Sequence, residues 1–150
     1  MNNDVNIIFH PNIGLGKIQF FFQEKEIIDV LGIPDKREID IQDTNDYVLR
    51  LFYIISDLSF YLHYEDNKFI YMSIHLNDVI LEELKLTLLS ERIVIDYIKD
   101  YHEKNHYIFL LEESFNSEMK ETCYYFESIG LTIWYEDGSI SDICVQNSRT

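Results

Sequence analysis

Several residue types are missing or scarce in this chain, and each absence narrows what the protein can be. Alanine is absent, while Ile, Asn, Tyr and Phe are abundant, which indicates a compositional bias of the genome. No apolar run approaches the length that crosses a bilayer, and residues 1–4 lack the basic start of a secretion signal. We therefore expect a cytoplasmic protein. In that compartment the two cysteines, Cys123 and Cys144, are expected to be reduced packing residues.

Basic residues are also few. The chain has 27 acidic side chains against 12 Lys and Arg, which gives a formal net charge of −15. Residues 1–76 carry 12 acids and 6 bases, and residues 77–150 carry 15 and 6, so the excess is spread along the chain. Such a surface repels nucleic acid and anionic membranes, because binding to phosphate groups requires Lys and Arg. It attracts basic proteins through long-range steering, although solubility is an equally good explanation of the charge.

No catalytic or metal-binding motif stands out. His102 and His106 could share a helical face, and His63 and His75 could meet across a hairpin, but neither pair has a third ligand at suitable spacing. No serine or cysteine lies in a nucleophile elbow. Residues 14–16 lack the third glycine of a dinucleotide-binding loop. We therefore predict no enzyme activity, no metal and no cofactor.

An internal repeat is the most informative pattern. Residues 64–69 (YEDNKF) recur as residues 135–140 (YEDGSI), at an offset of 71. At the same offset, apolar residues fall on apolar residues: Leu58, Phe60, Leu62, Met72 and Ile74 on Ile129, Leu131, Ile133, Ile143 and Val145. At an offset of 67, Glu24, Ile28 and Asp29 fall on Glu91, Ile95 and Asp96. We predict a single domain, 1–150, built of two repeats at about 13–76 and 80–147.

Local patterns predict the same elements in both repeats. A helix over residues 24–31 ends at Gly32, and a second helix covers residues 91–101. Strand-like runs follow each helix, with hairpin turns at residues 65–68 and 137–138. Short turns pair consecutive strands antiparallel. The predicted fold class is therefore α+β: two tandem helix-plus-antiparallel-meander repeats forming a sheet with helices on one face.

Alternation along the predicted strands separates two faces. One set of positions is strongly apolar and should face the helices, and the other carries Tyr, His and Trp and forms an open face. Tyr and Trp are favoured at protein-binding hot spots because they bury much area with few rotatable bonds. We predict that the open face binds a partner through aromatic anchors with acids around them: Tyr61, His63, Tyr71, His75 and Trp134, with Asp66, Glu136, Asp137 and Asp142. Alternatively, a loop, the N-terminal segment or a second copy covers this face.

One segment resembles known repeats. The helix end at residues 30–35 (VLGIPD), followed by Leu58-Ser59-Phe60 and Phe69-Ile70-Tyr71, resembles the repeat of the small β-barrel-assembly lipoproteins and of the tandem-repeat β-lactamase inhibitor proteins. The similarity spans most of residues 17–76 and is weaker over 84–145. Proteins of this look include soluble inhibitors and small bacterial immunity proteins, and the resemblance implies binding through a concave sheet face and its loops. The chain lacks a lipobox cysteine, which argues against an envelope lipoprotein.

These observations favour one functional class. We expect a cytoplasmic, acidic inhibitor or immunity protein that neutralises a basic toxin domain, in the first instance a nuclease, by covering its active site. No binding to nucleic acid or membrane is expected. The first alternative is a non-catalytic structural or adaptor domain that forms a homodimer through its aromatic sheet face. The second is a small-molecule binding module that uses the same aromatic residues.

Overall fold

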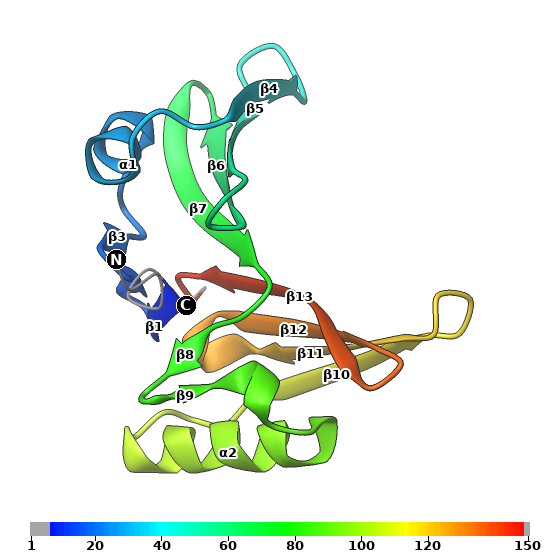
Figure 1. Cartoon of the computed structure of the whole chain (residues 1–150). Coiled ribbons are helices and arrows are strands. Elements are labelled where there is room, and N and C mark those ends of the chain that lie inside the picture. The colour runs from blue at the N-terminus through cyan, green and yellow to red at the C-terminus, as the bar shows by residue number, and fades with distance from the viewer. Residues whose placement is uncertain (1–6, 149–150) are drawn as a thin grey trace.

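A computed structural model describes residues 7–148 and shows two β-sheets and two α-helices (Figure 1). The strands of the large sheet are β4 (Lys36–Ile41), β5 (Tyr47–Tyr53), β6 (Leu58–Glu65), β7 (Lys68–Leu76), β10 (Leu111–Asn116), β11 (Glu121–Phe126), β12 (Leu131–Glu136) and β13 (Ser139–Gln146). The small sheet contains β1 (Ile8–His10), β2 (Gly14–Leu15), β3 (Ile18–Gln19), β8 (Ile80–Leu81) and β9 (Leu84–Lys85). The helices are α1 (Glu24–Leu31) and α2 (Glu91–Lys104).

The large sheet is antiparallel throughout and contains two meanders. Its eight strands follow the order β10-β11-β12-β13-β7-β6-β5-β4. The first meander, β4–β7, meets the second, β10–β13, where β7 pairs with β13. The small sheet has the order β3-β2-β1-β8-β9, and β1 and β8 are its one parallel pair among the residues described. The chain therefore alternates between the two sheets.

The predicted α+β fold class was wrong. Strands hold 47% of the described residues and helices 20%, in two helices only, so the fold is mainly β. The core on the buried side of the large sheet is shared by the small sheet, by Ile27 of α1 and by Val94 and Ile98 of α2, instead of being closed by a helical layer. The small-sheet strands have two or three residues each. Strands this short are too brief to show alternation, so the sequence pattern did not reveal that they form a second sheet.

The two central hairpins carry the sequence repeat. The β6–β7 turn has positive φ angles of 52° and 61° at Asp66 and Asn67, and the β12–β13 turn has 52° and 79° at Asp137 and Gly138. Both hairpins also shift register just before the turn, after His63 in one and after Trp134 in the other. The offset of 71 therefore relates equivalent positions in the two hairpins. The repeat boundaries 13–76 and 80–147 stay a prediction.

The two meanders are related by a local pseudo-two-fold axis. Ile74 and Val145, which the offset of 71 makes equivalent, pair with each other between β7 and β13. Because these two equivalent residues face each other, the pseudo-two-fold axis passes between them. Both side chains are fully buried. Because β7 and β13 are antiparallel, the two hairpin turns lie at opposite ends of the sheet (Figure 1).

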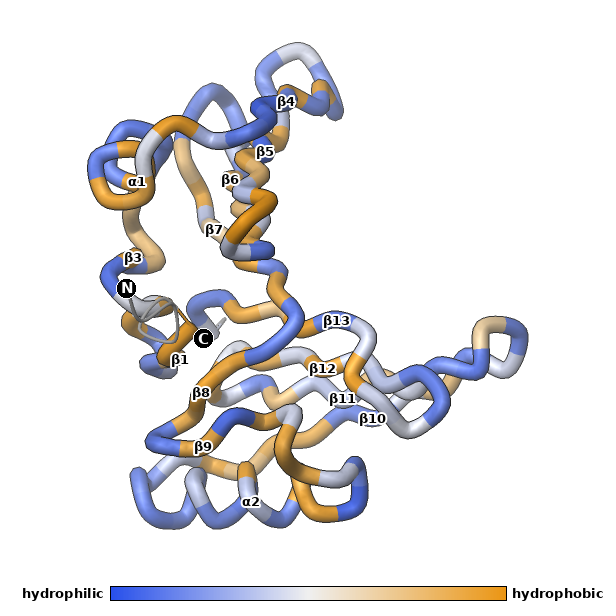
Figure 2. Tube along the Cα trace, viewed as in Figure 1, coloured by the Kyte–Doolittle hydropathy of each residue, from blue (hydrophilic) through white to orange (hydrophobic). Residues whose placement is uncertain are grey.

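Alternation correctly predicted the buried face of the central strands. In β6, Leu58, Phe60 and Leu62 are 2%, 0% and 0% exposed, and in β7 Met72 and Ile74 are 1% and 0% exposed. Figure 2 shows apolar residues recurring along the strands and hydrophilic residues at the β6–β7 and β12–β13 turns. The β6–β7 strand register read from the sequence is therefore confirmed. Within residues 7–148, neither helix combines the length and apolarity that a membrane crossing requires.

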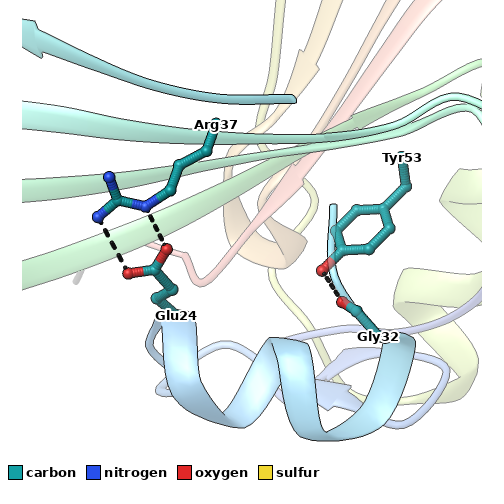
Figure 3. Close-up of polar contacts among 4 residues, drawn as sticks. All are labelled: Glu24, Gly32, Arg37 and Tyr53. Carbon is teal, nitrogen blue, oxygen red and sulfur yellow. Dashed lines mark hydrogen bonds and ion pairs between the residues drawn. The ribbon is translucent and has the colours of Figure 1, made fainter. Parts of the chain in front are cut away.

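Side-chain contacts fix α1 to the first meander at both ends (Figure 3). At its start, the Arg37 guanidinium donates to the Glu24 carboxylate, with Nε–Oε2 at 2.5 Å and Nη2–Oε1 at 3.2 Å. At its end, the Tyr53 hydroxyl donates to the Gly32 carbonyl oxygen at 2.8 Å. A helix of eight residues is too short to be stable alone. These contacts and the buried Ile27 therefore hold it in place.

Candidate partner-binding face

The side of the large sheet that faces away from the core is the open face. It carries Val48, Arg50, Phe52, Ser59, Tyr61, His63, Tyr71, Ser73, His75, Thr132, Trp134, Asp142 and Cys144. In Figure 1 the two meanders bend toward each other at the β7–β13 seam, and α1, α2 and the small sheet lie on the outside of the bend. The open face therefore lies on the inside of the bend, where it is concave.

The five predicted aromatic anchors come together on this face. Tyr61 and His63 belong to β6, Tyr71 and His75 to β7, and Trp134 to β12. All five are half-buried. They share one face of the sheet and form a row, the aromatic row, that crosses the seam between the meanders.

Ring contacts order the aromatic row. His63 and Tyr71 lie opposite each other and stack with centroids 4.1 Å apart and planes 7° apart. The Tyr61 and His75 centroids are 4.7 Å apart, and those of His75 and Trp134 are 6.3 Å apart with an interplanar angle of 18°. Rings held by their neighbours lose little entropy when a partner binds. The aromatic row is therefore a preorganised apolar surface.

An ion pair joins the two meanders within the row. Nδ1 of His75 in β7 lies 3.0 Å from Oδ2 of Asp142 in β13. Burial lowers the pKa of His75, but the hydrogen bond to Asp142 and the interaction with Cys144 outweigh it and raise the pKa to about 9. His75 is therefore an imidazolium at neutral pH, and its charge is balanced within the face.

This pair predicts a fall in stability at alkaline pH. The folded-state pKa of about 9 exceeds the ordinary 6.5, so the stabilisation is complete below pH 6.5 and is lost as the pH rises through 9. Since solvent screens this partly exposed pair, we expect a loss of about 1–2 kcal/mol. Urea unfolding of wild type and His75→Gln between about pH 6 and pH 10 measures it as a difference between the two proteins. Parallel pH profiles would contradict the assignment.

Sequence reasoning missed the part of the face that β4 and β5 contribute. Arg50 in β5 lies over the Tyr61 ring, with Cζ 5.5 Å from the centroid, and its Nη2 donates to Asp40 Oδ2 at 2.9 Å. Residues 47–53 alternate between buried and half-buried positions, so their sequence carried the signal. Arg50 extends the aromatic row with a paired cation.

The four acids of the predicted rim lie in three different places. Asp142 lies within the aromatic row. Asp66 lies in the β6–β7 turn, whereas Glu136 and Asp137 lie at the β12–β13 turn at the opposite end of the sheet. The structure does not bring these two ends together, because the strands that join the meanders are antiparallel.

The open face is hollowed beside the aromatic row. One hollow of about 480 Å³ is lined by Gln42, Val48, Arg50, Tyr61 and His63. A second, of about 690 Å³, shares Gln42, Val48 and His63 with it and extends to Tyr71 and Asn147. Both are wide open to solvent, so they suit side chains of a protein partner better than an enclosed small molecule.

Reactive and metal-binding groups were also located. Cys123 is a half-buried free thiol and Cys144 a buried one. Among residues 7–148, no three His, Cys, Asp or Glu side chains form a group that could hold a metal ion.

No family model, no curated protein and no solved structure matches the chain. The resemblance to tandem-repeat inhibitors and immunity proteins therefore stays a prediction.

Proposed function

We propose that this chain is a cytoplasmic, non-catalytic inhibitor of the immunity-protein type, which binds a basic toxin domain, in the first instance a nuclease, through its open face. The aromatic row is the observation that carries the proposal. Five half-buried rings, arranged as the stacked pair His63–Tyr71 and the group Tyr61–His75–Trp134, provide the large, rigid, amphipathic anchors that protein interfaces favour. The open face is concave, so its shape is complementary to a convex surface of the partner.

Charge supplies the second part of the proposal. A nuclease needs a cationic site for phosphate groups. A chain with a net charge of −15 is attracted to that site and competes with nucleic acid for it. Inhibition then requires complementarity and no chemical step.

A salt series tests the proposal. The probe is a panel of purified basic nuclease toxin domains, beginning with any toxin gene that lies next to this one. We expect stoichiometric inhibition of at least one, with an association rate that falls roughly tenfold or more between low and physiological salt, because exposed charges are screened over about 8–10 Å. Salt-independent association would contradict the electrostatic part, and inhibition of none would contradict the function.

A homodimer through the same face is the second candidate, because a second copy of the chain could equally cover the aromatic row. Each copy carries a charge of −15, so two copies repel each other. Sedimentation at low and high salt separates the two accounts. A dimer that persists at low salt favours the second copy, and a monomer favours the inhibitor.

A further inference from the structure

The β10–β11 hairpin ends in an exposed apolar tip. Phe115 is 66% exposed and Met119 is 61% exposed. The connecting loop, residues 117–120, projects from the body of the molecule beyond the β12–β13 turn (Figure 1). Single exposed apolar residues are common on protein surfaces. Two large ones at the end of a projecting hairpin indicate a contact element.

The first meander provides an internal comparison. The strand pairs of each meander can be counted outward from equivalent positions of the repeat. This count makes Ile41 at the end of β4 equivalent to Phe115 at the end of β10. In the first meander, the β4–β5 loop is tied to the neighbouring β6–β7 turn. The Asn67 amide donates to the Asn45 carbonyl oxygen at 2.9 Å, and the Asp66 amide donates to Asp46 Oδ1 at 2.9 Å.

The second meander leaves its hairpin tip untied. Asn116 Oδ1 accepts hydrogen bonds from the amides of Glu118 at 3.0 Å and Met119 at 3.2 Å, so the side chain shapes the loop from within. In the described part of the chain, we find no hydrogen bond from loop 117–120 to the β12–β13 turn. The tip is therefore shaped locally and stays free of the neighbouring turn. The local hydrogen bonds lower the entropy that the loop loses on binding.

Acidic residues surround the tip. Residues 112–121 contain four acids and one base, and residues 107–148 contain eight acids and one base. The first meander, residues 36–76, contains seven acids and four bases. The charge that attracts a basic partner is therefore strongest on the meander that carries the projecting hairpin.

We propose that the β10–β11 hairpin is a second contact element, which inserts Phe115 and Met119 into an apolar-floored cleft of the basic partner whose rim carries Lys and Arg. Clefts that hold single-stranded nucleic acid combine basic grooves with surfaces on which bases stack. An aromatic ring within an acidic hairpin matches both features, with Phe115 in the place of a base. Phe115 pairs with Thr122, and Glu113 with Tyr124, on the side of the sheet away from the open face. The cleft therefore receives the hairpin tip from that side, while the rest of the partner covers the open face. The inference rests on the proposed function, and it names the element that enters the partner's cleft.

The experiment compares the equivalent hairpins of the two meanders. Phe115→Ser/Met119→Ser removes the apolar tip, and Ile41→Ser removes an equivalent residue that is 73% exposed. Binding and inhibition are measured against the nuclease domain that wild type inhibits best in the panel above. We expect the double variant to bind at least about 30-fold more weakly and Ile41→Ser to bind like wild type. Melting temperatures of all three proteins should agree, because the replaced residues are exposed.

The outcomes separate this inference from the proposed function. Full inhibition by the double variant overturns the hairpin inference and leaves the proposed function standing. An equal loss of binding in Ile41→Ser also overturns it, because the effect would then not be specific to the second meander. A wild type that inhibits no domain of the panel overturns both. A wild-type dimer that the double variant abolishes would show that the tip binds a second copy, and would overturn the inference.

Discussion

Replacing Trp134 by alanine should weaken partner binding by about 2–4 kcal/mol, because hot-spot tryptophans carry binding energies of this size. Trp134 is the single tryptophan of the chain and lies at the end of the aromatic row, stacked on His75 across the seam. The side chain is partly exposed in the free protein, so its loss should affect the free energy of unfolding less than binding. Affinity is measured by calorimetry with the inhibited nuclease domain, and stability by urea unfolding.

A matched truncation outside the open face controls this result. Phe21 is 69% exposed and lies between β3 and α1, away from the aromatic row. Phe21→Ala should leave affinity unchanged. If Trp134→Ala lowers the melting temperature strongly and binds like wild type once folded, the face is a covered surface and the binding account is wrong.

Replacing Phe60 by alanine should destabilise the fold by about 3–5 kcal/mol, a large part of the 5–15 kcal/mol typical of a domain. Phe60 is 0% exposed and pairs with Leu51 on one side and Ile74 on the other. Its ring also contacts Tyr53, with centroids 5.8 Å apart and planes at 89°. The truncation leaves a cavity beside the pseudo-two-fold axis, where both meanders meet the core.

Phe115→Ala is the matched control for this change, since it truncates the same residue type at an exposed position. Its effect on the free energy of unfolding should stay within about 0.5 kcal/mol. Both variants are compared by urea unfolding at one pH. A change below about 1 kcal/mol for Phe60→Ala would mean that β6 does not contribute to the core in the way described.

The sequence predicted the central hairpins because their patterns are local. Residues 58–76 alternate cleanly, and the YED turn sequences mark the two tight turns at Asp66 and Asp137. The same alternation correctly assigned the aromatic row to the face away from the core. The helix at residues 24–31 was predicted with its observed bounds, because Gly32 adopts a φ of 87° that favours glycine.

The remaining features depend on contacts that are distant in the sequence. The small sheet joins residues 8–19 to residues 80–85 through strands too short to show a period. Predicting helices as the covering layer therefore gave the wrong fold class. The pairing of β7 with β13 sets which acids approach the aromatic row, and no local signal encodes it. This is why Asp142 lies among the rings, whereas Asp66 lies at one end of the sheet and Glu136 and Asp137 lie at the other.

Emission from Trp134 tests the central claim most directly, because the chain has one tryptophan and it lies on the open face. Incorporation of 5-hydroxytryptophan at this position separates its signal from tryptophans of the partner. In the free protein, acrylamide should quench the emission readily. On addition of the inhibited nuclease domain, the emission should shift to the blue and the quenching should fall as the ring becomes buried. An emission spectrum and quenching that stay unchanged while the nuclease is inhibited would contradict binding through this face.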